Sequence, residues 1–352
     1  MSPMRALIFV MLVLLLSFSS TSLGQEPDAS VLAFVSNSDD NLEIYLAIPS
    51  AETTINITKH DAEDFSPTWS PDGTKMAFVS NRDNENGDIF IMDSDGGNVT
   101  NITNNRFTQR TPTWSPDGTK IAFVSDEDNE SGGVYVMNPD GSEHRKIADG
   151  TMPAWSYDSQ YIAFVSSTNE TGTDIFVSGV SEGGEYNLTD DEVDGWLPQW
   201  SPNTLHIVFS AFEDETDKGL RVVSSDSGEI EVITGEEIGG ILPQWSPDGS
   251  MITFVSYQDN TYGDIFLVES DDSDIQNLTS IPEADLFPAW SSDSQYIAFL
   301  SGTNELSTFS LYVLNVNMNA LTLIQEDIIR DFDPIDLFGI GNILAWQPTQ
   351  GR

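Results

Sequence analysis

Cysteine is absent from this sequence of 352 residues, and basic residues are scarce. Without a thiol, the chain can have no disulfide bond, no thiol catalysis and no thiolate metal site. The 13 Lys and Arg residues stand against 57 Asp and Glu residues, which gives a formal net charge of −44. So much negative charge repels phosphate backbones, and no nucleic-acid partner is expected. The charge suits a divalent cation, a basic partner surface or a salty environment, and solubility alone is the alternative explanation.

Long apolar runs are also lacking, except at the N-terminus. There an unbroken run from Ala6 to Leu16 follows Arg5 and precedes small and polar residues. This pattern is typical of a secretory signal peptide, and the run is shorter than the roughly 20 residues that span a membrane. We predict a signal peptide over residues 1–24, cleaved near Gly24, and export to the periplasm or the cell exterior. An uncleaved anchor is the alternative, and no transmembrane segment is expected after cleavage.

Repetition is what the sequence has in abundance. The stretch PTWSPDGTKMAFVS at residues 67–80 returns almost unchanged at residues 112–125, and looser copies follow. A period in the forties indicates a repeat architecture. The copies are anchored on seven tryptophans: Trp69, Trp114, Trp155, Trp200, Trp245, Trp290 and Trp346.

Each copy predicts four short strands. The first strand ends at the tryptophan and starts near a proline, which cannot donate to a strand ladder. The Ser-Pro-Asp-Gly sequence that follows is typical of a tight turn. It leads to a nearly continuous apolar strand such as IAFVS, which should be buried on both faces. A more alternating third strand and a fourth strand that closes on NIT or NLT complete the unit.

The two ends of the chain favour a closed ring over an open array. The first strand signal is of the second type, VLAFVS at residues 31–36, and the last is a lone strand of the first type, ILAW at residues 343–346. Together they complete seven sets of four, which would remove the open edges of a radial array. We predict an all-β fold over residues 25–352: a monomeric seven-bladed β-propeller of four-stranded antiparallel blades, its ring closed by the C-terminal strand joining the N-terminal blade. A ring of six or eight blades would need a unit to be ignored or invented, and residues 325–342 have no assigned role.

The repeat PxWSPDGxxIAFVS, followed by GDIFxM, DGG and NLT, resembles the TolB-like, WD40-like (PD40) propeller repeat. Nearly complete copies lie at residues 67–103 and 112–148, and the resemblance covers essentially the whole chain after residue 24. It implies a noncatalytic scaffold whose loops or channel mouth bind another protein. The periplasmic TolB type pairs a six-bladed ring with an N-terminal α/β domain, whereas here residues 25–30 alone separate the expected cleavage site from the first strand. An equivalent role is therefore not implied.

No catalytic residue is predicted. The same repeat family forms the propeller of prolyl-oligopeptidase-like peptidases, and a G-x-S-x-G string does surround Ser181. That motif works at a strand–turn–helix elbow, whereas Ser181 falls in a predicted hairpin. His60, His144 and His206 fall in different blades, so a shared histidine site is not expected.

The loops between the second and third strands are the candidates for a metal ion. They alternate oxygen-bearing residues before a glycine, which resembles a calcium-binding loop in composition. They lack the full calcium-loop pattern, and ordinary hairpins use the same residue types. The candidate calcium ligands are Asp83, Glu85, Asp128, Glu130 and Asp259, and no other cofactor is predicted.

A second group of acidic residues comes just before the first strands. In a propeller these connections and the candidate metal loops lie on the same face, around the mouth of the central channel. The residues predicted to bind a protein or peptide partner are Asp64, Asp194, Trp196, Glu237 and Asp285. A solvated rim is the alternative.

Taken together, these signals predict an exported, noncatalytic scaffold. The alternative function is a propeller enzyme, a lyase or glycosidase, that uses channel-mouth carboxylates and a metal. Such an enzyme would need titratable groups that converge and have perturbed pKa values. A third alternative is a stability-only module in a larger assembly.

Overall fold

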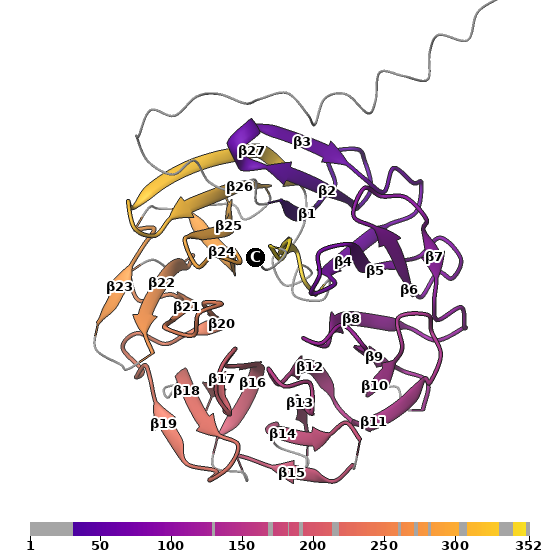
Figure 1. Cartoon of the computed structure of the whole chain (residues 1–352). Helices are drawn as coiled ribbons and strands as arrows, with labels where there is room; N and C mark the ends of the chain where they lie inside the picture. Colours follow the sequence, from indigo (N-terminus) through magenta and orange to yellow (C-terminus); the bar gives the residue numbers. More distant parts are fainter. Residues whose placement is uncertain are drawn as a thin grey trace, which may run out of the picture.

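The computed structural model describes residues 31–128, 131–167, 172–181, 183–189, 193–212, 218–259, 262–270, 274–280, 283–302, 308–330 and 341–349. Within these residues the strands form seven four-stranded antiparallel sheets, arranged radially around a central axis (Figure 1). The expected seven-bladed β-propeller is thereby confirmed. The predicted signal peptide, residues 1–24, lies outside the described residues and stays a prediction, as does the domain boundary at residue 25.

The blades follow one another in chain order, and each runs from an innermost to an outermost strand. Blade 1 also contains a short 3-10 helix, η1 (Pro49–Ala51), between its third and fourth strands. From the innermost strand outward, the blades are β28 (Leu344–Trp346), β1 (Leu32–Ser36), β2 (Glu43–Ile48) and β3 (Thr53–Asn56); β4 (Asp64–Trp69), β5 (Lys75–Ser80), β6 (Asp88–Asp93) and β7 (Thr100–Asn101); β8 (Gln109–Trp114), β9 (Ile121–Ser125), β10 (Gly133–Met137) and β11 (Arg145–Asp149); β12 (Thr151–Trp155), β13 (Tyr161–Ser166), β14 (Asp174–Gly179) and β15 (Glu185–Asn187); β16 (Asp194–Trp200), β17 (His206–Phe212), β18 (Lys218–Ser224) and β19 (Ile230–Val232); β20 (Ile241–Trp245), β21 (Met251–Ser256), β22 (Asp264–Glu269) and β23 (Ile275–Asn277); β24 (Ala284–Trp290), β25 (Tyr296–Gly302), β26 (Thr308–Asn315) and β27 (Ala320–Arg330).

The core is a ring of phenylalanines. The second strand of every blade places one phenylalanine at its centre with no exposed surface, as expected for an apolar strand covered on both faces. In six blades this ring lies near an aromatic ring of the next strand, with centroids 5.4–5.9 Å apart. The seven residues are Phe34, Phe78, Phe123, Phe164, Phe209, Phe254 and Phe299.

The repeated tryptophans connect neighbouring blades. The indole N–H of Trp69 donates to the carbonyl of Ala345, and that of Trp346 donates to the carbonyl of Ala289, both at 3.0 Å. Each acceptor is the residue just before the tryptophan of the preceding blade. Trp155, Trp245 and Trp290 make the same bond at 3.1–3.3 Å. The tryptophans therefore serve as blade-to-blade packing residues.

The ring is closed where the two ends of the chain meet. Strand β28 pairs antiparallel with β1, with Leu32 opposite Trp346 and Phe34 opposite Leu344. A backbone hydrogen bond from the Gln347 N–H to the Val31 carbonyl, 2.8 Å long, extends the pairing beyond the strands. The C-terminal strand thus completes blade 1, as the sequence predicted.

A second contact joins blade 7 to blade 1. The Ser36 hydroxyl donates to the Ile328 carbonyl at 2.6 Å, and the Asn37 backbone N–H donates to the same oxygen at 3.0 Å. The Asn37 side chain also bonds both backbone groups of Arg330. Residues 325–330, for which the sequence suggested no role, therefore include a second set of hydrogen bonds between blades 7 and 1.

Candidate functional site

The residues predicted to bind a partner gather at one end of the ring. Asp64, Asp194 and Asp285 lie at the beginning of the innermost strands β4, β16 and β24, and Trp196 follows in β16. Glu237 lies in the connection that leads to β20. Because Asp64 is paired with Ser80, the last residue of β5, the loops that follow the second strands lie at the same end. We call this side of the ring the acidic face.

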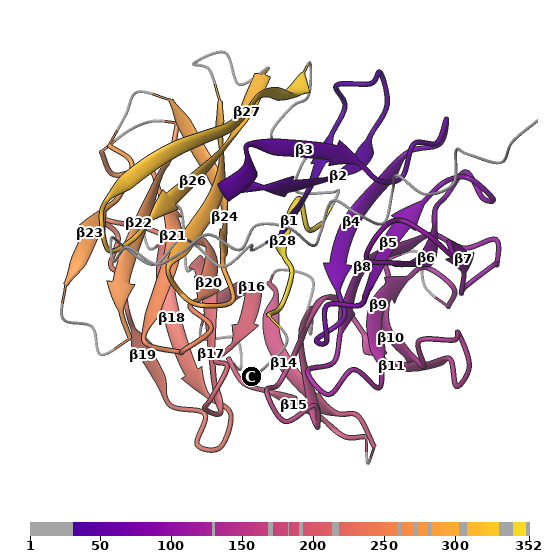
Figure 2. The same ribbon diagram turned by 45° about the horizontal axis from the view of Figure 1, so that its top comes forward.

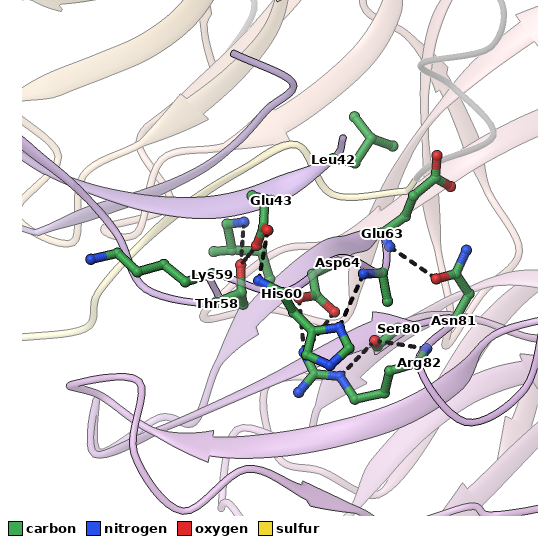
Figure 3. A network of polar contacts seen from close by, with 12 residues as sticks. Leu42, Glu43, Thr58, Lys59, His60, Glu63, Asp64, Ser80, Asn81 and Arg82 are labelled. Atoms are coloured by element: carbon green, nitrogen blue, oxygen red, sulfur yellow. Dashed lines mark hydrogen bonds and ion pairs between the residues drawn. The ribbon is translucent and has the colours of Figure 1, made fainter. Parts of the chain in front are cut away.

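Asp64 is held inside the junction of blades 1 and 2 (Figure 3). It has no exposed surface, and both of its carboxylate oxygens accept hydrogen bonds of 2.8 Å from the Arg82 guanidinium. Arg82 also donates from Nε to the Ser80 hydroxyl and lies over the ring of Phe90, 5.0 Å from its centroid. A buried charge needs such a partner and full hydrogen bonding. The sequence did not single out Arg82, and in this arrangement Asp64 offers no free oxygen to a partner.

Glu43 is a second buried acid at the same junction (Figure 3). It accepts hydrogen bonds from the Thr58 hydroxyl and, at 2.8 Å, from the His60 backbone N–H. Burial raises the pKa of the Glu43 carboxyl, and the nearby charge of Asp64 adds to this, whereas the hydrogen bonds oppose it. Glu43 thus accepts hydrogen bonds on the blade 1 side of this junction.

Asp285 occupies in blade 7 the position that Asp64 has in blade 2, five residues before the repeated tryptophan. It also has no exposed surface, but neither carboxylate oxygen has a hydrogen-bond partner of normal geometry among the described residues. Burial raises the pKa of Asp285 to about 7. The negative charges of Asp264 and Glu283 act in the same direction, and the nearby Ser301 and Thr279 hydroxyls oppose it in part. Asp285 is therefore a buried acid that lacks the partner Asp64 has.

The other three predicted partner-binding residues reach the solvent. The Trp196 side chain is 37% exposed, Glu237 is exposed, and Asp194 is half-buried. Asp194 accepts a 3.0 Å hydrogen bond from the Thr173 backbone N–H through one carboxylate oxygen. Together they give the acidic face accessible carboxylates and one accessible aromatic ring.

The candidate calcium ligands are divided among three blades. The Asn101 amide donates to Asp83 at 3.1 Å, and the Asn277 amide donates to Asp259 at the same distance. Asp128 accepts from the Tyr135 hydroxyl at 2.8 Å. Glu85 is exposed, and Glu130 lies outside the described residues. Within the parts of the chain that the structure describes, no three His, Cys, Asp or Glu side chains come together in a way that could hold a metal ion.

The third and fourth strands of a blade are joined by side-chain hydrogen bonds, here called the latch, that were not predicted from the sequence. In blade 2, Asp88 accepts from the Asn101 amide at 2.9 Å and from the Thr103 hydroxyl at 3.0 Å. The same hydroxyl accepts from the Ile89 backbone N–H. Blade 4 repeats the latch with Asp174, Asn187 and Thr189. The signal was available in the sequence, because an aspartate at the start of the third strand recurs together with NIT or NLT at the fourth.

This latch gives several N-x-[ST] sequons a structural role. In blades 2 and 4 the asparagine amide and the threonine hydroxyl of the sequon are both used inside the blade. Asn277 makes the corresponding bond to Asp264 in blade 6. The occurrence of these N-x-[ST] triplets is thus explained by the hydrogen bonds that their side chains make inside the blades.

The serine and histidine residues considered in the sequence lie in the elements that were expected for them. Ser181 is exposed in the turn between β14 and β15, and the described residues around it form a β-hairpin without a helix. His60 lies before β4, His144 before β11 and His206 at the start of β17. His144 contacts Glu127 at 3.3 Å, within blade 3. The three histidines do not share a site.

A ring of seven four-stranded blades, each built from one copy of the same sequence repeat, defines a repeat β-propeller. The sequence matches the PD40 family, described as the TolB beta propeller domain, over residues 19–152, 83–228 and 134–333. These matches span most of the chain, which therefore belongs to this family. In the part of the chain that the structure describes, no helix is long and apolar enough to cross a membrane.

Individual relatives agree with this assignment. A TolB homologue of Chlorobium luteolum is 43% identical over 65 residues, which are 18% of this chain and 14% of that protein. The chain therefore covers only a small part of that relative. TolB from Acinetobacter baumannii has a similar structure, with a TM-score of 0.57, 15% identity, and 91% of this chain and 82% of that chain covered.

An enzyme has the same fold. The oligogalacturonate lyase of Vibrio parahaemolyticus has a TM-score of 0.64 and 14% identity, with 85% of each chain covered. At such low identity the likeness shows a shared fold alone.

Proposed function

We propose that this chain is an exported, noncatalytic scaffold that binds a basic protein or peptide partner through its acidic face. The observation that carries the proposal is the placement of Asp194, Trp196 and Glu237 at the same end of the inner strands, with their side chains reaching solvent. Carboxylates around an aromatic ring suit a Lys- or Arg-rich segment, because the charges guide the encounter and the ring adds contact area. Membership of the TolB propeller family supports a role in protein binding.

The test compares two faces of the same ring. A triple variant, Asp194→Asn, Trp196→Ala and Glu237→Gln, removes the accessible groups of the acidic face. Asp226→Asn is the matched control, because Asp226 is exposed in a turn between the third and fourth strands, at the opposite end of the ring. Proteins captured from the host envelope by the parent chain should be lost with the triple variant and kept with the control. Equal capture by all three proteins would contradict the proposal.

A calcium-assisted version of this function is a separate proposal. It rests on the acidic hairpin loops that contain Asp83, Glu85, Asp128 and Asp259, together with Glu130 in sequence. Ligand binding to the folded state alone raises the midpoint of thermal unfolding. Calcium should therefore raise the midpoint and a chelator should reverse the effect. No shift with calcium or magnesium would rule out this version.

The alternative function, a lyase or glycosidase at the channel mouth, is supported by the fold it shares with an oligogalacturonate lyase. Asp285 has the raised pKa that a general acid would need, but the residue is fully buried. Incubation with a panel of glycans, with and without added manganese, tests this alternative. Product formation that is lost in the Asp285→Asn variant would favour the enzyme over the scaffold.

A further inference from the structure

The junction of blades 6 and 7 repeats the junction of blades 1 and 2. At each junction the innermost strand of one blade packs against the third strand of the blade before it: β4 against β2, and β24 against β22 (Figures 1 and 2). An acid begins each of these third strands, Glu43 in β2 and Asp264 in β22. The charge of Asp64 acts on Glu43, and the charge of Asp264 acts on Asp285. Two acids therefore meet at each junction.

The acceptors that hold the Arg82 guanidinium are also repeated. This guanidinium donates to both oxygens of Asp64 and to the Ser80 hydroxyl (Figure 3). Asp64 lies opposite Ser80 in the pairing of β4 with β5, and Asp285 lies opposite Ser301 in the pairing of β24 with β25. The Ser301 hydroxyl is close enough to Asp285 to affect its pKa. Blade 7 therefore has a carboxylate and a hydroxyl in the same two positions.

A pair of stacked aromatic rings is repeated as well. The Arg82 guanidinium lies over Phe78 and Phe90, 5.6 and 5.0 Å from the ring centroids. These two residues are opposite each other in the second and third strands of blade 2, with their rings stacked. Phe299 and Tyr312 are the corresponding opposite residues of blade 7, and their rings also stack, with centroids 5.9 Å apart. A carboxylate beside aromatic rings suits a guanidinium, which can donate two parallel hydrogen bonds and stack on a ring.

Blade 7 lacks only the cation. Neither oxygen of the fully buried Asp285 accepts a hydrogen bond of normal geometry from the described residues. The sequence has no Lys, Arg or His between residues 241 and 329, which contain all of both blades except Arg330, the last residue of β27. The Arg330 side chain is more than half exposed and contacts Asp327. Because a buried carboxylate needs a partner, a cation from outside these blades would complete the junction.

We propose that Asp285, Ser301, Phe299 and Tyr312 form an arginine-binding site, in which a protein or peptide partner supplies the guanidinium that Arg82 supplies inside blade 2. The inference rests on the proposed function, because the arginine belongs to the basic partner of the acidic face. Lysine fits less well, since its ammonium cannot donate two parallel hydrogen bonds in one plane. A metal ion also fits less well, since aromatic rings are not metal ligands and the described residues contain no group of three acids that could hold one.

The arginine site lies on the acidic face. Asp285 is near the beginning of β24, at the end of the ring where Asp64 begins β4. Glu283 and Tyr312, which both interact electrostatically with Asp285, are half-buried and therefore reach solvent. Because Asp285 itself is fully buried, the arginine enters by a local opening of the junction. The exposed acids of the face attract the basic partner, and Asp285 selects for arginine.

The pKa of Asp285 gives the arginine site a pH dependence. Burial raises this pKa to about 7, and the negative charges of Asp264 and Glu283 act in the same direction. The other groups near Asp285 are the hydroxyls of Ser301, Thr279 and Tyr312. None of these groups is a cation. Because only the ionised carboxylate attracts a guanidinium, arginine binding should strengthen as pH rises from 5 to 8.

Calorimetric titration of the full chain with three capped tripeptides tests the arginine site. The tripeptides have glycine at both ends and arginine, lysine or citrulline in the middle, and citrulline has the shape of arginine without its charge. At pH 8 and high salt, which screens the exposed acids, the arginine tripeptide should bind about tenfold or more tightly than the other two. Asp285→Asn should weaken its binding by about tenfold or more, because the charge of the buried carboxylate is lost. Asp226→Asn, an exposed acid at the opposite end of the ring, is the matched control and should bind as the parent chain does.

The result can be read separately from the test of the proposed function. The tripeptides need no envelope protein, whereas the triple variant of the acidic face is tested by capture. Arginine-selective binding that is lost in Asp285→Asn supports the arginine site even where no envelope protein is captured. Equal binding of the arginine and citrulline tripeptides, or arginine binding that Asp285→Asn leaves intact, would overturn the site even where capture depends on the acidic face.

Discussion

Asp64 and Asp285 show how strongly the effect of one residue depends on its neighbours. Both lie five residues before a repeated tryptophan, and both are fully buried. Asp64 accepts two hydrogen bonds from the Arg82 guanidinium, whereas Asp285 has the Ser301 and Thr279 hydroxyls and the negative charges of Asp264 and Glu283 nearby. The same residue type at the same repeat position is therefore part of a buried ion pair in one blade and a buried acid with a raised pKa in another.

The raised pKa of Asp285 predicts the direction of a pH effect. A carboxyl with a pKa of 3.8 in the unfolded chain and about 7 in the folded chain holds its proton more tightly when folded. Its contribution to stability is fully present below pH 3.8 and is lost as pH rises toward 7, by an amount on the order of a few kcal/mol. Asp285→Asn should remove this slope and make the protein more stable than the parent at pH 8. Urea unfolding at pH 5 and pH 8 measures both values, and an unchanged slope would show that Asp285 is not the titrating group.

The Asp64–Arg82 pair should behave in the opposite way. Asp64→Asn leaves the Arg82 guanidinium without its carboxylate partner in a largely buried site, which should cost about 3–5 kcal/mol of stability. The double variant Asp64→Asn, Arg82→Met should recover part of this loss, because it removes the unpaired charge as well. Urea unfolding at pH 7 gives the comparison. A double variant less stable than Asp64→Asn would show that Arg82 contributes mainly through its contacts with Phe78 and Phe90.

At the scale of the elements, the latch between the third and fourth strands holds the outer part of a blade. In blade 2 the fourth strand, β7, has only two residues, so ladder hydrogen bonds alone hold it weakly. Asp88 compensates by accepting from the Asn101 amide and the Thr103 hydroxyl. The latch thus explains how so short a strand keeps its place.

Removing the threonine hydroxyl should loosen this latch. Thr103→Val keeps the shape of the side chain but removes one of the donors to Asp88 and leaves the Ile89 N–H without its acceptor. The expected loss is about 1–3 kcal/mol. Thr100→Val is the control, because Thr100 is exposed in β7, three residues before Thr103, and its hydroxyl donates to the Asn98 carbonyl at 3.2 Å. Thermal melts should separate the two variants, and equal midpoints would argue against the latch.

The elements also show what could be predicted from the sequence. The blades were predictable because the tryptophan, the Ser-Pro-Asp-Gly turn and the buried strand recur at fixed spacing. Each of these signals determines the structure of its own short stretch of chain. The position of the acidic face followed from the order of the strands. The burial of Asp64 and Asp285 was not predictable, because it depends on packing between strands and blades that are distant in the sequence. The sequence signal was acidity alone, which is the same for a buried acid and for an exposed one such as Glu237.

A backbone feature of the inner strands was also missed. In six blades the residue before the repeated proline has a positive φ of 48–58°, and the pairing with the second strand shifts there. Residues before proline ordinarily favour an extended conformation, so the sequence suggested a regular strand. The conformational preferences of the individual residues therefore did not predict this bulge. The six residues are Ser66, Thr111, Met152, Leu197, Leu242 and Phe287.

At the scale of the whole molecule, stability depends on the closure of the ring. Strand β28 supplies the innermost strand of blade 1, and its Trp346 bonds the Ala289 carbonyl of blade 7. Removing residues 341–352 should expose the inner edge of β1 and uncover blade 7, so the thermal transition should move to lower temperature and broaden. A synthetic peptide of residues 341–349 should restore part of the loss when added in trans. Removing residues 350–352 alone is the control and should leave the melt unchanged. A sharp, unshifted transition after the longer deletion would contradict a role for β28 in closure.

The pairing of β1 with β28 also determines when the ring can close relative to synthesis of the chain. Strand β1 cannot complete its sheet until β28 has been synthesised. The contact spans more than 300 residues of sequence, and contacts of such long range slow folding. Until then blade 1 has an open inner edge, which is a hazard for aggregation during synthesis. The ring therefore closes only after β28 has been synthesised and has paired with β1.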